Sequence, residues 1–295
     1  MATQVKEYVG RTPLSNPIFD IVYKSPKYIA VNKPFDVCVD GDDREITLLK
    51  HLAVKYPEHA GQYRLVNRID YATSGLVLTA VTREAANKAG NLFQSRETLK
   101  QYLALVWGHM TPLYIEGKEG SKQTEITIDQ PIADDNNDSN SFKMMIGTEA
   151  NPGRKSQTII RVLEHGYYNN KPASKVHMIP HTGRRHQLRV HLMSLGHVIV
   201  GDETYGPKDG DCPRMMLHSW KLSIDKLGLD LETPDPFDGL LSSSPSTSSS
   251  TSSATTQGST SEQVDVPEIT KDTLDSNDNN DIKEENSTST ISTNN

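Results

Sequence analysis

The sequence predicts an α+β fold built on a mainly antiparallel sheet. Strand-like and helical segments are mixed along the chain without the regular strand–helix–strand alternation of a parallel sheet. No repeat of solenoid length is visible, and 295 residues are enough for one large core or two smaller ones. We therefore expect a mixed sheet flanked by helices and loops.

The acidic charge of the chain belongs to its C-terminal end. The formal net charge is −7, but residues 233–295 hold 11 acidic and 2 basic residues, a net charge of −9. The preceding residues therefore carry a net charge of +2. From Leu241 onward Ser, Thr and Asn dominate, and such a segment cannot bury enough apolar surface to offset the entropy of ordering its backbone. We expect an N-terminal extension at 1–17, a folded domain at 18–232 and a disordered tail at 233–295.

The individual elements follow from the spacing of apolar residues. Short β-rich runs bounded by Pro and Gly predict strands, and apolar residues three and four apart predict helices. Thr47 is a suitable N-cap for the first helix, and Gly196 is a suitable C-cap for the last, in which Leu188, Leu192 and Leu195 are expected to stack. In chain order we expect strands at 19–23 and 28–31, a helix at 47–56, strands at 65–69 and 75–81, a helix at 83–96, a strand at 102–107, excursions off the sheet at 111–153 and a helix beginning after Gly183.

Several classes of protein are not expected from this composition. Cys38 and Cys212 are far apart and in no zinc-like spacing, which argues against a disulfide scaffold and for a reducing compartment. The longest uncharged apolar stretch, at 101–115, is too short to span a bilayer. The N-terminal residues lack the apolar core of a secretory signal. We expect a protein of the cytoplasm or nucleus that has no membrane partner.

Asp70 is the first candidate for chemistry. It follows a β-rich run and precedes a small-residue turn, so its carboxylate would lie at the end of a strand. Arg68 would share its face of that strand and keep it ionised, as a nucleophile requires. The alternative is that Asp70 only accepts hydrogen bonds in a turn, a common use of Asp before Thr-Ser-Gly. Position alone favours the turn.

A basic segment is the second candidate. Between Arg154 and Arg189 there are 8 basic residues and one acidic residue. Such a patch suits phosphate contacts along a nucleic acid, and the alternative is a solvated charged face. Arg184, Arg185 and Arg189 favour anion binding, because they lie at the predicted start of a helix, where free N–H groups and the helix dipole attract anions.

Histidines in the same region raise the hypothesis of a metal-dependent hydrolase. Pro and Gly interrupt this segment, so the first two histidines cannot share a regular helix face. Their spacing also matches none of the zinc signatures of hydrolases, and we predict no metal site. The histidines are His177, His181, His186 and His191.

Four stretches together resemble the catalytic domain of the RluA-type RNA pseudouridine synthases. They are VNKP at 31–34, RLVNRIDYATSGLVLTA at 64–80, LKQYLALVWG at 99–108 and HTGRRHQLRVHLMSLGHVIVGDETYG at 181–206. The resemblance spans about residues 18–223, and TGRRHQLRVH is its most specific part. It implies the pseudouridine synthase catalytic fold at 18–232 and a monomer that acts on tRNA, rRNA or another structured RNA.

The resemblance also implies a reaction. The enzyme would isomerise specific uridines in RNA to pseudouridine after flipping them out of the stack, with no cofactor and no metal. Asp70 would be the catalytic nucleophile, and Arg189 would be its ion-pair partner. Tyr102 would stack on the extruded uracil and take part in proton transfer. The resemblance implies that Asp70 attacks either the sugar or the base.

The resemblance also implies contacts with RNA, and the sequence differs from the family pattern at one position. Lys33 and Arg68 would contact phosphate or fill the gap in the stack, and Arg184 and Arg185 would contact phosphate. Asn67 stands where the family usually has His. This departure supports the alternative of a catalytically inactive RNA-binding relative with the same fold. A further alternative is an interaction scaffold based on the tail.

Overall fold

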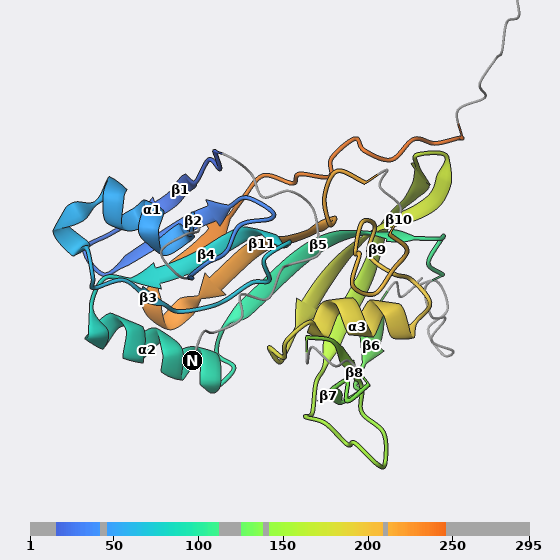
Figure 1. Cartoon of the computed structure of the whole chain (residues 1–295), viewed down its shortest axis with the longest axis horizontal. Coiled ribbons are helices and arrows are strands. Elements are labelled where there is room, and N and C mark those ends of the chain that lie inside the picture. Colours follow the sequence, from blue (N-terminus) through green and yellow to red (C-terminus); the bar gives the residue numbers. More distant parts are fainter. Residues whose placement is uncertain (1–15, 42–45, 112–124, 138–141, 209–211, 246–295) are drawn as a thin grey trace, which may run out of the picture. The chain divides into compact units, whose positions relative to one another are not determined.

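The computed structural model describes residues 16–41, 46–111, 125–137, 142–208 and 212–245, which belong to one compact unit (Figure 1). The expected extension lies outside the described residues up to residue 15, and so does the expected tail from residue 246. Cys38 and Cys212 do not form a disulfide bond with each other. In the described part of the chain, no helix has the length and apolar character needed to cross a membrane.

A mixed sheet of ten strands organises the fold (Figure 1). Its order along the main path is β1 (Asp20–Lys24), β2 (Tyr28–Lys33), β4 (Ser74–Ala80), β11 (Leu217–Ile224), β5 (Leu99–Trp107), β10 (Lys171–Pro180), β9 (Thr158–Tyr168) and β6 (Glu125–Ile128). The short strands β3 (Arg64–Leu65) and β12 (Leu229–Glu232) pair with β4 and β11. Strands β4 and β11 pair in parallel, and the other pairings of this sheet are antiparallel, which confirms the predicted fold class.

Helices α1 (Leu48–Lys55) and α2 (Arg83–Gln94) cover opposite faces of the β2–β4 half of the sheet. Side chains alternate between the faces of a strand, so Leu76 and Leu78 pack with α2 whereas Val77 packs with α1. Every residue of β4 is buried, as expected for a strand covered on both faces. The Thr47 side chain accepts a hydrogen bond from the backbone N of Lys50 at 3.3 Å, which confirms the predicted N-cap.

Helix α3 (Gln187–Ser194) packs its Leu188 and Leu192 against the β5, β10, β9 and β6 half of the sheet. It begins later than predicted, because residues 183–186 form a loop held by side-chain hydrogen bonds. Beyond its C-terminus Gly196 takes a positive φ of 79°, which completes the expected glycine termination. Leu195 is exposed rather than stacked. The hairpin of β7 (Ile132–Asp134) and β8 (Met144–Ile146) lies beside this helix.

Residues 233–245 pack against the sheet, whereas the sequence predicts that the disordered tail begins at residue 233. The Phe237 side chain is only 1% exposed and belongs to the same core as β5 and β10. Asp235 forms an ion pair with Lys175, and Ser242 exchanges two backbone hydrogen bonds with Tyr167. The buried Phe237 side chain contributes apolar contacts to this attachment, and composition averaged over the tail does not reveal it.

A glycine permits the parallel contact that joins the two halves of the sheet. Gly75 of β4 has a φ of 109°, and a Cβ atom added there would lie 2.2 Å from the carbonyl oxygen of Ser219 on β11. Only glycine tolerates both this backbone conformation and this approach. The contact fixes the start of β4, and therefore the loop before it, against β11 and β5.

Candidate active site

Asp70 lies in the loop between β3 and β4. Strand β3 ends at Leu65, so the predicted strand at 65–69 is wrong beyond this residue, and Arg68 does not share a strand face with Asp70. Asn67 fixes the loop, because its Oδ1 accepts from the backbone N of Leu78 at 2.7 Å and its Nδ2 donates to the carbonyl of Leu76 at 3.3 Å. The loop leaves the Asp70 side chain 27% exposed.

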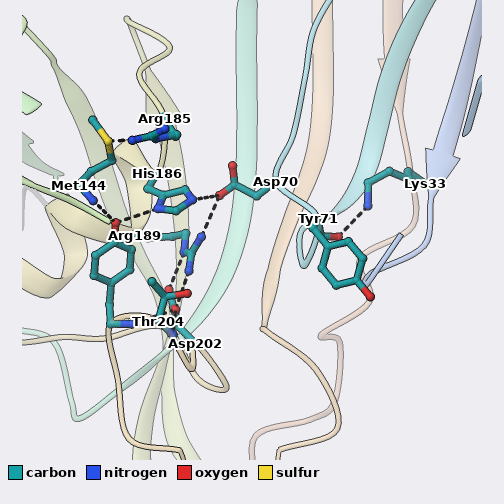
Figure 2. A network of polar contacts seen from close by, with 10 residues as sticks. Lys33, Asp70, Tyr71, Met144, Arg185, His186, Arg189, Asp202 and Thr204 are labelled. Atoms are coloured by element: carbon teal, nitrogen blue, oxygen red, sulfur yellow. Dashed lines mark hydrogen bonds and ion pairs between the residues drawn. The ribbon is translucent and has the colours of Figure 1, made fainter. Parts of the chain in front are cut away.

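Lys33 supports this loop from inside the protein. Its ammonium group donates to the carbonyl oxygens of Pro34 at 2.8 Å and Val37 at 2.7 Å. It also donates to the carbonyl oxygen of Tyr71 at 3.0 Å (Figure 2). The side chain is fully buried, and burial lowers its pKa to about 7. The prediction that Lys33 contacts RNA is therefore corrected, because this lysine instead holds the residue next to Asp70 in place.

Arg189 lies between two carboxylates. Its Nη1 donates to Oδ2 of Asp70 at 3.2 Å, while its Nε and Nη2 donate to both oxygens of Asp202 at 2.7 and 2.8 Å (Figure 2). Burial alone would lower the pKa of Arg189, but the hydrogen bonds and charge of Asp202, together with the charge of Asp70, raise it above its ordinary value. The planar two-bond contact thus belongs to Asp202, and Asp70 receives a single bond.

Asp202 is a site residue that sequence reasoning missed. Its side chain is 1% exposed, and its Oδ1 also accepts from the backbone N of Thr204 at 3.0 Å and of Tyr205 at 3.2 Å. Such a turn in the GDETYG segment is a common use of Asp. The only indication in the sequence is that this segment lies within the stretch 181–206, which resembles the pseudouridine synthases. The neighbouring residues do not indicate that Asp202 contacts Arg189.

His186 and Tyr205 complete the network around Asp70. The His186 ring places Nε2 3.9 Å from Oδ2 of Asp70 (Figure 2). Its Nδ1 lies 2.8 Å from the Tyr205 hydroxyl. That hydroxyl also accepts from the backbone N of Met144 at 2.8 Å. Burial lowers the pKa of His186 to about 4, so the ring is neutral at physiological pH. Burial also raises the pKa of Tyr205 to about 12.

A pocket of about 400 Å³ opens at Asp70. Its volume falls in the range of small-molecule sites. Asp70, Tyr102 and Arg189, which come from the loop before β4, from β5 and from α3, all line it, with apolar walls from Phe93, Leu188 and Leu217. Burial raises the pKa of Tyr102 to about 12, so its phenol keeps its proton. The structure therefore brings the three predicted catalytic residues to one pocket.

The predicted RNA-contacting arginines divide into two groups. Arg68 is exposed and lines the pocket, and Arg184 lines it while donating to the carbonyl of Lys155 at 3.3 Å. Arg185 does not line the pocket and instead donates to Oδ1 of Asp134 at 2.8 Å. Arg184 and Arg185 precede α3 rather than open it. Phosphate contacts at the pocket mouth therefore suit Arg68 and Arg184 better than Arg185.

Lys100 lines the pocket and is another residue that sequence reasoning missed. Its ammonium group donates to the carbonyl of Thr182 at 3.0 Å, and burial lowers its pKa to about 8. The lysine lies two residues before Tyr102 on β5 and so shares its side of the strand. Together with Arg68, Arg184 and Arg189, it makes four cationic side chains in the lining of the pocket.

Three of the four histidines considered as metal ligands have other side-chain partners. His177, His186 and His191 lie within 2.8 to 2.9 Å of Gln101, Tyr205 and Thr158. Across the residues that the structure describes, no group of three His, Cys, Asp or Glu side chains is arranged to hold a metal ion. Nothing in this arrangement favours the metal-dependent hydrolase.

A mixed sheet that presents a partly exposed carboxylate in a pocket lined by cations is typical of an enzyme that acts on a nucleic acid. Comparison with known proteins identifies the family within this class of enzymes. The chain belongs to the RNA pseudouridylate synthase family, whose model matches residues 27–194. This family comprises RNA-modifying isomerases of the pseudouridine synthase type.

Two curated relatives and one solved structure illustrate the match. RNA pseudouridylate synthase domain-containing protein 1 of Homo sapiens is 40% identical over 232 residues, which cover 74% of this chain and 70% of the relative. The dual-specificity RNA pseudouridine synthase RluA of Escherichia coli K12 is 33% identical over 217 residues, which cover 72% of this chain and 89% of RluA. The structure of human RNA Pseudouridylate Synthase Domain Containing 1 superposes with a TM-score of 0.66 at 36% identity, and the match covers 80% of this chain and 92% of that one.

Proposed function

We propose that this protein converts specific uridines in structured RNA to pseudouridine, with Asp70 as the catalytic nucleophile. The observation that carries the proposal is the Asp70 carboxylate, which is partly exposed in the pocket and receives a hydrogen bond from the buried Arg189 at 3.2 Å. An ionised carboxylate beside a fixed cation, open to a pocket of this size, is suited to covalent catalysis.

The reaction is an isomerisation, so all atoms are conserved. The bond from C1′ of the ribose to N1 of the uracil breaks, the base turns, and C1′ bonds to C5. The proton leaves C5 and N1 gains one. Asp70 can form a covalent intermediate through the sugar or the base, and both paths need one ionised carboxylate with no oxidant or reductant.

Tyr102 is proposed to stack on the extruded uracil. Its ring lines the pocket together with Asp70, and aromatic rings bind the π-faces of bases. With a pKa raised to about 12 by burial, its phenol is a poor base at neutral pH. The hydroxyl therefore serves as a hydrogen-bond donor or as a relay for a proton, and not as the group that removes the C5 proton unaided.

The nucleotide must leave the RNA stack before it reaches Asp70, which costs a few kcal/mol. Arg68 is exposed beside the pocket and Arg184 lines it, so both suit phosphate contacts that offset this cost. Arg185 would have to exchange its ion pair with Asp134 for a phosphate. Because phosphate contacts carry no sequence information, unstacked loop bases or RNA shape would select the uridine.

The proposal is tested by Asp70→Asn in the full chain. Asparagine keeps the size and can accept the Arg189 hydrogen bond, but an amide cannot replace the carboxylate as nucleophile. Pseudouridines are mapped in total RNA treated with wild-type or variant protein. We expect Asp70→Asn to lower product formation by roughly 10⁴-fold or more. Asp230→Asn, at an exposed position of β12, should keep full turnover.

The same experiment separates the enzyme from an inactive RNA-binding relative. If wild-type protein binds RNA but forms no pseudouridine on any transcript, and Asn67→His creates activity, the binding relative is correct. If Asp70→Asn keeps its turnover, Asp70 is only a turn residue. The hydrogen bonds of Asn67 to the backbone of β4 support the enzyme, because they give this departure a structural role in the loop.

A further inference from the structure

His186 is a partly buried residue in an uncommon backbone conformation beside Asp70. Its φ of 54° and ψ of 16° are left-handed, and its side chain is 13% exposed. Residues other than glycine rarely take this conformation, and those that do cluster at functional sites. The surrounding structure maintains this backbone conformation. The side-chain amide oxygen Oε1 of Gln187 accepts from the backbone N of Arg184 at 3.0 Å and from the Thr182 hydroxyl at 2.7 Å.

The hydrogen bonds around Tyr205 favour one tautomer of the neutral His186 ring. The backbone N of Met144 can only donate, so the Tyr205 oxygen accepts at that contact. The phenolic proton is then available for Nδ1 of His186, 2.8 Å away. A neutral imidazole that accepts at Nδ1 carries its proton on Nε2. The N–H of His186 therefore faces the carboxylate of Asp70.

Charges of both signs surround His186. Asp70 and Asp202 favour the protonated ring, whereas Arg189 and Arg185 disfavour it, and burial outweighs each of them, lowering the pKa to about 4. His186 is thus a neutral donor beside Asp70. Its neutrality matters, because a second full cation would lower the nucleophilicity of the carboxylate more than a neutral N–H does.

Arg189 and His186 face the same oxygen of Asp70. Nη1 of Arg189 is 3.2 Å from Oδ2, and Nε2 of His186 is 3.9 Å from the same atom (Figure 2). Hydrogen bonds in unliganded active sites are often long and shorten when substrate binds. In the described part of the chain, Oδ1 of Asp70 has no hydrogen-bond partner, so it is the oxygen open to substrate.

We propose that His186 is a positioning residue for the isomerisation: its Nε2–H, fixed by Tyr205, holds Oδ2 of Asp70 together with Arg189, so that Oδ1 attacks. This inference rests on the proposed function of Asp70. His186 keeps its proton throughout the reaction and transfers none. The alternative is that His186 only supports the fold by accepting the Tyr205 hydrogen bond.

Two substitutions separate these roles, because each retains only one of the two hydrogen-bonding functions of the ring. His186→Asn tolerates the left-handed backbone and retains an acceptor near Nδ1 for Tyr205, but it has no donor near Nε2. His186→Gln reaches the place of Nε2 with an amide donor and loses the acceptor at Nδ1. Single-turnover rates of the full chain are measured on an RNA substrate at saturating protein, with thermal unfolding measured in parallel.

We expect His186→Asn to slow the reaction roughly 100-fold while unfolding at nearly the wild-type temperature. His186→Gln should be less stable and yet react within about tenfold of the wild-type rate. His181→Asn, at an exposed histidine of the same segment, should leave the rate unchanged. If His186→Asn is as fast as wild type, or His186→Gln is no faster than His186→Asn, the positioning role is overturned.

A second measurement does not depend on turnover. In protein with ¹⁵N-labelled histidine, the ring signals of His186 are assigned by their loss in His186→Gln. We expect a proton on Nε2, none on Nδ1, and no titration between pH 5 and 8, since the ring pKa is lowered to about 4. A proton on Nδ1, or a ring that titrates near its ordinary pKa, would refute the inference even if the wild-type protein proved inactive on the RNA tested.

Discussion

At the scale of single residues, the candidate site depends on how one arginine is shared. Arg189 donates two hydrogen bonds to the buried Asp202 and one to the more exposed Asp70. Because Asp202 neutralises and orients the guanidinium, Asp70 has a fixed cation beside it without being buried itself. A buried ion pair of this kind is weak evidence for stability, but it fixes geometry when its bonds are complete.

This arrangement predicts that Arg189→Lys impairs the chemical step far more than Arg185→Lys. Lysine cannot span Asp202 and Asp70 together, because it is a point donor and lacks the planar fork of arginine. We expect Arg189→Lys to lower the single-turnover rate at saturating protein by roughly 100-fold or more.

The matched substitution distinguishes chemistry from binding. Arg185 pairs with the exposed Asp134 outside the pocket, so Arg185→Lys should weaken RNA affinity by a few-fold and leave the saturated rate close to wild type. Rates and affinities are read from the same protein titration. Equal losses of the saturated rate in both variants would show that the two roles are wrongly assigned.

At the scale of elements, the site depends on how the two halves of the sheet meet. The loop that carries Asp70 precedes β4, and Tyr102 lies on β5, with β11 between these two strands. Ser219 of β11 is the common neighbour, because it pairs with Gly75 on one side and with Tyr102 on the other. A shift of β4 relative to β11 would therefore move Asp70 away from Tyr102.

Gly75→Ala tests this contact. The added methyl group would lie 2.2 Å from the carbonyl oxygen of Ser219, at a positive φ that alanine rarely adopts. We expect the free energy of unfolding to fall by at least about 2 kcal/mol, measured by chemical denaturation.

Gly90→Ala is the matched control within α2. A Cβ atom there meets no heavy atom within 4 Å, and the residue is an ordinary helical glycine. Alanine should therefore raise the free energy of unfolding by about 0.5–1 kcal/mol. A Gly75→Ala protein as stable as Gly90→Ala would mean that β4 and β11 can separate without cost.

At the scale of the whole molecule, the compact unit extends past the position at which composition changes. Thr233 hydrogen bonds to His218, and Phe237 belongs to the main core, so residues 233–245 are part of the folded body. The acidic charge that the sequence assigns to residues 233–295 is therefore divided between this packed segment and residues outside the described part of the chain.

Two truncations test this boundary. A chain that ends at residue 247 keeps the whole compact unit, and we expect wild-type turnover and stability. A chain that ends at residue 232 loses the buried Phe237 and the Asp235–Lys175 ion pair, and its free energy of unfolding should fall by about 3–5 kcal/mol. Calorimetry and the pseudouridine assay are applied to both. Loss of turnover at 247 with intact folding would instead indicate a tail that binds substrate.

The sequence by itself determined the family, the fold class, the hairpin of β1 and β2, and helices α1 and α2, because these depend on local patterns and on long contiguous motifs. Only the tertiary structure decided that Asp202 holds Arg189, that His186 faces Asp70, and that Lys33 is buried. In the sequence, Asp202 resembles an ordinary turn residue and Lys33 resembles a surface cation. Their partners are set by strand pairing and burial across distant segments, and these long-range contacts leave no local pattern in the chain.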